Sequence, residues 1–308
     1  MIRDFQYSQT LRSKIRQRIK DEILPRIVDT KIDMYLRTND EISSDPILHG
    51  AHEPVVQSLL QFLAEDYKDF FSDIGANVGL SSVHCGDRFA RVDCVEPNQL
   101  IAAVLSSNLA LNLQRADYHV HKVGLAARSG GAELLVPPHN FGGGFVLEGN
   151  DYDLALLAAK DQFARFDREN YKTQQVDLVD SAEWLAGLFK TYRESNLTTG
   201  VVKVDAEGFE RTIVQSILEV LPDEFRVVIV IENWTPVFDH TPYASARHNL
   251  TFKVVQKKPP AEVGRIRRSL RFLRALISGV KYSLVELSEA EGRPDNVVLF
   301  VDPIGKEN

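Results

Sequence analysis

The chain has 308 residues, a formal net charge of −7, 44% hydrophobic and 26% charged residues. This balance is typical of a globular protein and excludes collagen, coiled-coil and disordered chains. It also argues against sequence-independent nucleic-acid binding, which needs clustered cations, and two cysteines are too few for a disulfide scaffold.

Residues 1–50 are predicted to form a helical extension. Apolar residues recur every four positions from Leu11 to Ile23, Pro25 then interrupts the pattern, and a second helical piece is predicted over residues 27–36. The beginning of the chain lacks the apolar stretch of a signal peptide. We therefore expect a cytoplasmic protein.

A membrane span is not expected either. The longest apolar run covers only residues 227–231, whereas a spanning helix needs about 20 apolar residues.

From residue 69 onward, the pattern changes to alternating strands and helices. The predicted strands cover residues 69–74, 91–95, 118–123, 132–136, 201–204, 227–231, 251–255, 281–287 and 297–301. The predicted helices cover residues 54–63, 100–111, 151–167 and 181–192, and a further one begins at Val78. This alternation predicts one doubly wound α/β sheet with helices on both faces, closed by an antiparallel hairpin of its last two strands.

The first motif is a glycine-bearing turn between a strand and a helix, residues 73–79 (DIGANVG). Glycine lets the backbone approach a ligand closely, and the start of a helix offers free N–H groups. Gly75 and Gly79 are four residues apart, which matches neither the dinucleotide fingerprint nor a P-loop. Because the turn has no lysine and carries Asp73, it suits a ligand with a positive amino group better than a pyrophosphate.

Glu96 ends the next strand, 21 residues after Gly75. A carboxylate at this place can accept hydrogen bonds from both hydroxyls of a ribose. This feature alone does not separate an adenosylmethionine site from a nicotinamide dinucleotide site.

The second motif, residues 201–210 (VVKVDAEGFE), is an apolar strand that ends in carboxylates. Ligands of open α/β sheets bind beyond the carboxyl ends of the strands, so Asp205 and Glu207 are candidates for the reacting centre. Lys203 is expected to orient these acids or to offset their charge. Glu210 either belongs to this centre or is a first-turn acid favoured by the helix dipole.

Together these motifs resemble the FkbM-type S-adenosylmethionine-dependent methyltransferases, over residues 53–301. The resemblance implies a class I methyltransferase fold: a seven-stranded Rossmann-like sheet with an antiparallel last strand, here within residues 51–303. It also implies methyl transfer to a hydroxyl of a carbohydrate or similar metabolite. The cofactor-binding residues would be Asp73, Gly75, Ala76, Asn77, Gly79, Glu96 and Pro97, and the catalytic residues Asp205, Glu207 and Lys203.

The substrate side is the least determined part of the chain. Residues 148–171 look like an insertion, and residues 140–144 (NFGGG) resemble the family's Asn/Gly loop. The candidate substrate-binding residues are Asn140, Gly143, Glu232 and Trp234. A basic amphipathic helix is predicted over residues 264–277. It either packs against the protein by its apolar stripe or docks an acidic acceptor, such as a phosphorylated or lipid-linked glycan.

A metal is the alternative to a carboxylate base at the reacting centre. Asp205 ends one strand, and Glu232 with Asn233 ends the next, so their oxygens could form a site for Mg²⁺ or Ca²⁺. We favour the metal-free base, in which Asp205 or Glu207 takes the proton of the acceptor hydroxyl.

Three other functions remain to be compared with the methyltransferase hypothesis. A nicotinamide-dependent oxidoreductase is disfavoured by the absence of a third glycine from the turn. Nucleic-acid methylation is disfavoured because the acid-rich turn at residues 205–208 would repel phosphate. A catalytically silent binding module would use the basic helix as its interaction face.

Overall fold

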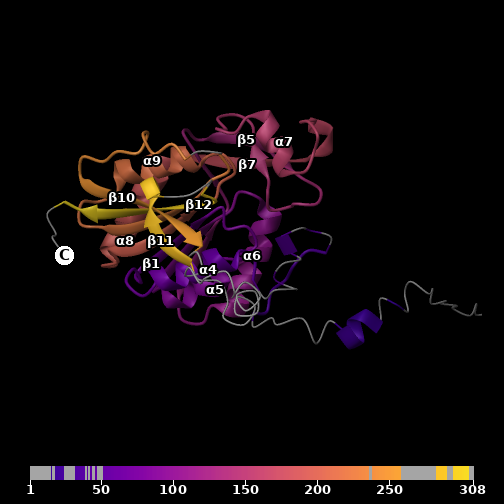
Figure 1. Ribbon diagram of the computed structural model, residues 1–308, viewed down its shortest axis with the longest axis horizontal. Helices are drawn as coiled ribbons and strands as arrows, with labels where there is room; N and C mark the ends of the chain where they lie inside the picture. The colour runs from indigo at the N-terminus through magenta and orange to yellow at the C-terminus, as the bar shows by residue number, and fades with distance from the viewer. Residues whose placement is uncertain are drawn as a thin grey trace, which may run out of the picture.

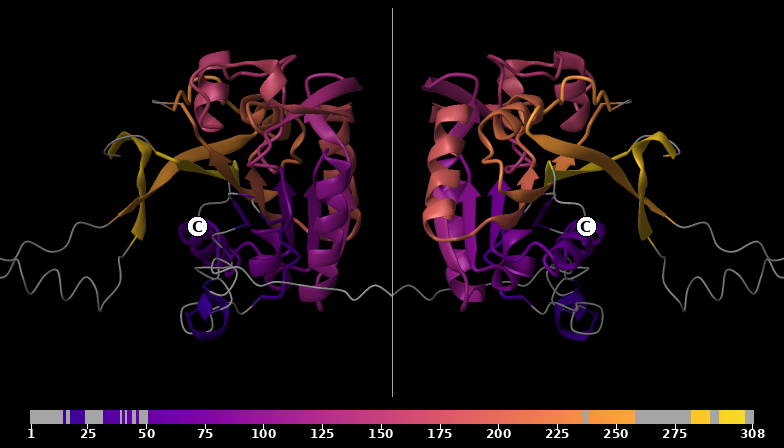
Figure 2. Two further views of the ribbon diagram at one scale, coloured as in Figure 1. Left: turned by 90° about the vertical axis from the view of Figure 1, so that its right-hand side faces the viewer. Right: turned by 90° about the vertical axis from the view of Figure 1, so that its left-hand side faces the viewer.

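The computed structural model describes residues 15, 18–23, 32–38, 40, 42–43, 46, 51–235, 238–257, 282–289 and 294–304. These residues form a large mixed sheet with helices on both faces and a small second sheet beside its strand ends (Figures 1 and 2). The large sheet has eight strands in the order β11-β10-β12-β9-β8-β1-β2-β3. Their bounds are β1 Phe70–Ile74, β2 Arg91–Val95, β3 Asp117–His121, β8 Thr199–Val204, β9 Arg226–Glu232, β10 His248–Lys257, β11 Tyr282–Glu286 and β12 Asn296–Pro303.

The strand directions define the fold class. Strands β3, β2, β1, β8 and β9 are parallel, and β12, the last strand of the chain, lies antiparallel between β9 and β10. Apart from the edge strand β11, this is the Rossmann-like sheet of class I methyltransferases. The predicted doubly wound α/β fold with an antiparallel last strand is confirmed, and β11 adds an eighth strand to the seven expected.

The predicted hairpin of the last two strands is wrong. β11 and β12 both pair antiparallel with β10, on its two opposite edges. Two strands that are both antiparallel to a third run parallel to each other, so they cannot form a hairpin. The sequence pattern identified the strands but not their partners.

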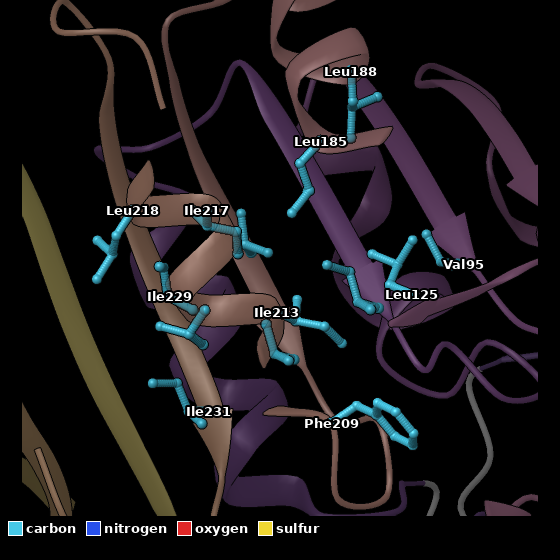
Figure 3. Packing of buried hydrophobic residues seen from close by; sticks show 14 of the residues in the cluster. Val95, Leu125, Leu185, Leu188, Phe209, Ile213, Ile217, Leu218, Ile229 and Ile231 are labelled. Atoms are coloured by element: carbon cyan, nitrogen blue, oxygen red, sulfur yellow. The ribbon is translucent and has the colours of Figure 1, made fainter. Parts of the chain in front are cut away.

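The central strands β8 and β9 are buried on both faces, as their apolar runs predicted. In β9, Val227, Ile229 and Ile231 pack into one core, whereas Val228 and Val230 pack into the other. This alternation follows from the two-residue period of a strand. Figure 3 shows the first core, where Ile229 and Ile231 lie opposite the helical side chains.

Among the described residues, five helices cover the two faces. α8 (Ser181–Glu194) and α9 (Glu210–Val220) close the first core, and α4 (Pro54–Leu63), α5 (Ser82–Cys85) and α6 (Gln99–Asn112) close the second. The predicted start of α8 is confirmed, because the Asp180 side chain accepts a hydrogen bond from the Glu183 N–H at 2.9 Å. The helix predicted to begin at Val78 begins at Ser82 instead: α5 has four residues and continues into a 3-10 turn, η2 (Gly86–Arg88).

The second sheet, which has four strands, was not predicted from the sequence. It has the order β4-β7-β5-β6, and it gathers with helix α7 at one end of the molecule (Figure 1). Its elements are β4 Gly124–Ala126, β5 Gly130–Val136, β6 Phe145–Val146, α7 Leu154–Lys160, η3 Arg168–Asn170 and β7 Lys172–Asp180. The predicted helix over residues 151–167 is therefore limited to α7. An aromatic cluster that includes Phe145, Tyr152 and Tyr171 fills the space between α7 and this sheet.

Only part of the N-terminal extension belongs to the described residues. Ile19–Ile23 form a π-helical turn (η1), whereas residues 32–37 run without regular helix, contrary to the helix predicted over residues 27–36. The Tyr35 backbone instead pairs with the Asn108 side chain of α6, N–H to Oδ1 at 2.7 Å and Nδ2 to the Tyr35 carbonyl at 3.2 Å. The basic helix predicted at residues 264–277 lies outside the described residues, and η5 (Leu287–Glu289) follows β11.

Candidate functional site

A cavity of about 580 Å³ opens where the parallel strands β1, β2, β8 and β9 end. The second sheet and the loops after β1 and β8 complete its wall. Twelve residues predicted for the site line it: Asp73, Gly75, Ala76, Asn77, Glu96, Pro97, Asn140, Lys203, Asp205, Glu207, Glu232 and Trp234.

Gly75 allows the turns after β1 and β8 to meet. β1 and β8 are neighbours, with Ile74 beside Val204, and a Cβ on Gly75 would lie 1.6 Å from the carbonyl oxygen of Asp205. Gly75 also has a φ of 81°, in the left-handed region that glycine adopts without strain. The glycine thus serves the contact between two loops at the cavity floor.

Asp73 is buried at the floor of the cavity, with 1% of its surface exposed. Ser82 donates a hydrogen bond to its Oδ2 at 2.6 Å, whereas its Oδ1 has no hydrogen-bond partner among the described residues. Burial raises the pKa of this carboxyl, opposed by the charge of Lys203 and by the Ser82 hydrogen bond. A buried carboxylate oxygen without a partner is costly, so it marks a place for a donor from a ligand.

Glu96 receives two backbone hydrogen bonds at the edge of the cavity. Its Oε2 accepts from the Asn77 N–H at 3.0 Å, and its Oε1 accepts from the Asn98 N–H at 2.9 Å. Each carboxylate oxygen retains a further lone pair for a hydroxyl donor. Burial raises the pKa of Glu96 to about 7, although the two backbone donors oppose the shift.

Lys203 is the centre of a group of acids, of which Asp73 is buried and Glu53 and Asp205 are half-buried. Its ammonium lies 2.6 Å from Asp205 Oδ2. Burial works against the charge, but Asp205, Asp73 and Glu53 together raise the pKa of Lys203 well above its usual value, so the residue is charged. The sequence predicted Lys203 and two of these acids, but not Glu53, which precedes α4.

Asp205 and Glu232 form a carboxyl pair across the ends of β8 and β9. Each is a hydrogen-bond partner of the other. Burial, and then the charge of Asp205, raise the pKa of Glu232 far above its ordinary range. Burial would also raise the pKa of Asp205, but Lys203 and the hydrogen bond from Glu232 lower it overall. Glu232 is therefore the protonated member of the pair, and Asp205 is the carboxylate.

Glu207 enters the cavity from a strained turn. Its φ is 50°, an uncommon value for a residue other than glycine. Its carboxylate forms an ion pair with the ammonium of Lys160, the last residue of α7. Lys160 was missing from the sequence prediction, because no local motif singles out this one lysine of the 148–171 segment.

The glycine loop and an aromatic side chain form the outer wall. Gly142 packs so tightly on the turn after β1 that a Cβ there would lie 1.8 Å from Asn77 Nδ2. Asn140 Oδ1 accepts a hydrogen bond from the Gly143 N–H at 3.1 Å, which folds the loop on itself. Trp234 lines the cavity immediately after β9.

Three predicted residues lie elsewhere. Gly79 packs against α6, where a Cβ would lie 2.9 Å from Leu105 Cδ1, and neither Gly79 nor Gly143 lines the cavity. Asn233 is not brought to the acids, because its Oδ1 accepts from Thr235 Oγ1 at 2.6 Å and its Nδ2 donates to the Pro294 carbonyl at 2.8 Å. The three-residue metal set of Asp205, Glu232 and Asn233 is therefore not assembled as predicted.

Within the described part of the chain, no three His, Cys, Asp or Glu side chains are grouped so as to hold a metal ion. In the same residues, no helix has the length and apolar character needed to span a membrane.

Comparison with known proteins gives structural neighbours only. No family model matches the chain, and no curated protein matches it. Similar solved structures include precorrin-8w decarboxylase of Methanobacterium thermoautotrophicum (13% identity over 81% of this chain and 90% of that chain, TM-score 0.33). They also include a SAM-dependent methyltransferase of Agrobacterium tumefaciens (9% identity over 82% of this chain and 62% of that chain, TM-score 0.38). A third is an rRNA methylase of Streptococcus thermophilus (10% identity over 80% of this chain and 96% of that chain, TM-score 0.34). Because these TM-scores and identities are low, the fold assignment rests on the strand order.

Proposed function

We propose that this protein is an S-adenosylmethionine-dependent methyltransferase that acts on a hydroxyl group. The observation that carries the proposal is the pair of buried carboxylates at the ends of two neighbouring strands: Asp73 is the last residue but one of β1, and Glu96 directly follows β2. Asp73 has an oxygen without a hydrogen-bond partner among the described residues, and Glu96 has free lone pairs toward the cavity.

The residues of the cavity fit the three parts of this cofactor. The partnerless Oδ1 of Asp73 suits the ammonium of the methionine part, and Glu96 suits the two ribose hydroxyls. Apolar side chains beside Glu96 suit an adenine ring; they are Pro97, Val123, Leu125 and Leu178. When bound, S-adenosylmethionine supplies an electrophilic methyl group on a sulfonium.

The protein's own task is then to orient a hydroxyl and to remove its proton. Glu207 lines the cavity, and we assign to its carboxylate the role of taking the proton from the acceptor hydroxyl. Asp205 is already engaged by Lys203 and Glu232, so we assign to it a part in holding the acceptor and not the proton transfer. We assign to the Asp205–Glu232 pair the orientation of the acceptor, because Glu232 Oε2 has no hydrogen-bond partner among the described residues and can accept from the acceptor's hydroxyl groups. This scheme uses no metal.

The acceptor that this cavity favours is uncharged. Six carboxyl groups line it, against the lysines Lys160 and Lys203; they are Glu53, Asp73, Glu96, Asp205, Glu207 and Glu232. Such a lining repels phosphate, which disfavours nucleic acid and phosphorylated acceptors. Asn140 offers hydrogen bonds and Trp234 an aromatic face, so a carbohydrate hydroxyl is our preferred acceptor.

Product analysis tests this function. We expect the protein to release S-adenosylhomocysteine from S-adenosylmethionine in the presence of an uncharged saccharide panel, with Glu207→Gln as the inactive control. Binding of S-adenosylmethionine without release on any acceptor would support the silent binding module instead. Transfer to RNA alone would overturn the assignment of the acceptor.

A further inference from the structure

Lys160 lies in a niche that has the composition of a cation-binding site. Its side chain is 6% exposed, and its ammonium lies 4.7 Å from the ring centre of Trp234 and 5.4 Å from that of Tyr152. The Glu207 carboxylate completes the niche as its ion-pair partner. Aromatic faces and a carboxylate are the groups that attract an ammonium most strongly in a desolvated place.

The partner of Lys160 sits on backbone that needs external support. Glu207 has a φ of 50°, which costs free energy for a residue with a side chain and persists only where the surroundings hold it. Within its own chain region, the turn is held by Glu210, whose carboxylate accepts from the Ala206 N–H at 2.8 Å and from the Gly208 N–H at 3.0 Å. From outside, it is held by Asn150, whose Nδ2 donates to the Glu207 carbonyl at 2.8 Å, and by the Asp151 N–H, which donates to the Gly208 carbonyl at 2.9 Å.

The segment of residues 150–160 therefore contacts Glu207 at two points, its carbonyl and its carboxylate. Its beginning, Asn150 and Asp151, fixes the backbone of the turn, and its later part, Lys160, fixes the carboxylate. The segment forms no strand of the large sheet, and α7 belongs to the aromatic cluster beside the second sheet. The position of the Glu207 carboxylate thus depends on a segment outside the large sheet, whereas Asp73 and Glu96 lie on strands of that sheet or directly after them.

We propose that Lys160 is a positioning residue that holds the Glu207 carboxylate toward the acceptor. The inference rests on the proposed function only in that Glu207 takes the acceptor's proton; the niche itself exists without any acceptor. Lys160 does not react in this scheme. Its removal releases the Glu207 turn, and an ammonium ion that refills the niche restores the turn.

The test is chemical rescue of Lys160→Ala, measured by amide hydrogen exchange. The substitution removes a propylammonium group, so n-propylammonium is the probe. We expect the amides of residues 206–208 to exchange at least about tenfold faster in Lys160→Ala than in the wild type, because a buried ion pair is lost. Millimolar n-propylammonium is expected to slow this exchange again, and Lys160→Arg to keep most of the protection.

Lys190→Ala is the matched control, since Lys190 also faces a glutamate, Glu194, at 4.0 Å but is 76% exposed. It is expected to change neither the exchange of residues 206–208 nor the response to n-propylammonium. Unchanged exchange in Lys160→Ala, or an equal effect of n-propylammonium on the variant and the wild type, would overturn the positioning role. If Lys160→Ala does not fold, Lys160→Arg and Lys160→Met are compared: equal exchange in these two variants would also overturn it.

Titration with S-adenosylmethionine keeps this inference separate from the proposed function. The affinity of Lys160→Ala is expected to stay within about twofold of the wild type, because Asp73 and Glu96 lie at other strand ends. If the wild type binds no S-adenosylmethionine, the proposed function fails, whereas the exchange result still decides the role of Lys160.

Discussion

The two sides of the cavity are built in different ways. On the cofactor side, Asp73 lies in β1 and Glu96 follows the adjacent parallel strand β2, and their hydrogen bonds come from the residues after these two strands, namely Asn77, Ser82 and Asn98. On the acceptor side, Glu210 holds the amides on either side of Glu207, but the Glu207 carbonyl and carboxylate are held by Asn150 and Lys160, which belong to a distant segment. The cofactor side is therefore held by the large sheet and the loops that leave it, whereas the Glu207 carboxylate also depends on packing of a segment outside that sheet.

The largest effect is expected at the junction of the two sides, from Gly75→Ala. A Cβ there would lie 1.6 Å from the Asp205 carbonyl oxygen. The turn also holds residue 75 at a positive φ, which is unfavourable for a residue with a side chain. We expect a loss of roughly 4 kcal/mol of unfolding free energy, measured by denaturant titration. Gly130→Ala is the control, because nothing lies within 4 Å of its Cβ position, and a comparable loss there would refute the steric argument.

Asp205→Ala tests the acceptor side by kinetics. We expect kcat for S-adenosylhomocysteine release to fall at least about 10²-fold, as for a lost acid–base or orienting group, with S-adenosylmethionine affinity largely kept. A variant that loses cofactor affinity but keeps its kcat would place Asp205 on the cofactor side instead.

Glu96→Ala tests the cofactor side by calorimetry. The lost charge-assisted hydrogen bonds are expected to weaken S-adenosylmethionine binding by about 1.5–3 kcal/mol. Glu219→Ala, a carboxylate of α9 that does not line the cavity, serves as the control. The two variants would show the same affinity if the ligand bound elsewhere.

The pH dependence of binding sharpens the same comparison. Burial raises the pKa of Glu96 to about 7, and ribose hydroxyls favour its ionised form. Binding must therefore release a proton below pH 7, and the affinity is expected to rise about tenfold from pH 6 to pH 8. Glu96→Gln is expected to remove this dependence, and a wild-type affinity that falls with pH would contradict the assignment.

The same pKa shift affects the stability of the ligand-free protein with the opposite sign. Between the ordinary pKa of 4.5 and about 7, the folded state keeps a proton on Glu96 that the unfolded state loses. The Glu96 contribution to stability therefore decreases as the pH rises through this window.

The smallest effect is expected from a chelator. Because the proposed scheme moves the acceptor's proton to Glu207 without a metal, we expect turnover to be unchanged after EDTA treatment. Loss of activity and its recovery with Mg²⁺ would replace the carboxylate base by a metal-activated hydroxyl.

The comparison also explains what could be predicted from the sequence. Strand periodicity and the two motifs predicted the sheet, its helices, and the convergence of Asp73, Glu96 and Asp205, because parallel strands end at one edge. The position of Asn233 was not predictable, since a local hydrogen bond with Thr235 takes its amide away. Lys160 and the second sheet depend on pairings such as β5 with β7, which no residue pattern specifies.

The central claim is that the cavity takes S-adenosylmethionine through Asp73 and Glu96, and one set of titrations tests it most directly. Wild type, Asp73→Asn and Glu96→Gln are each titrated with S-adenosylmethionine and with NAD by calorimetry. We predict that the wild type binds S-adenosylmethionine and not NAD, and that each substitution weakens this binding about tenfold or more. Binding of NAD in place of S-adenosylmethionine, or unchanged affinity in both variants, would contradict the account.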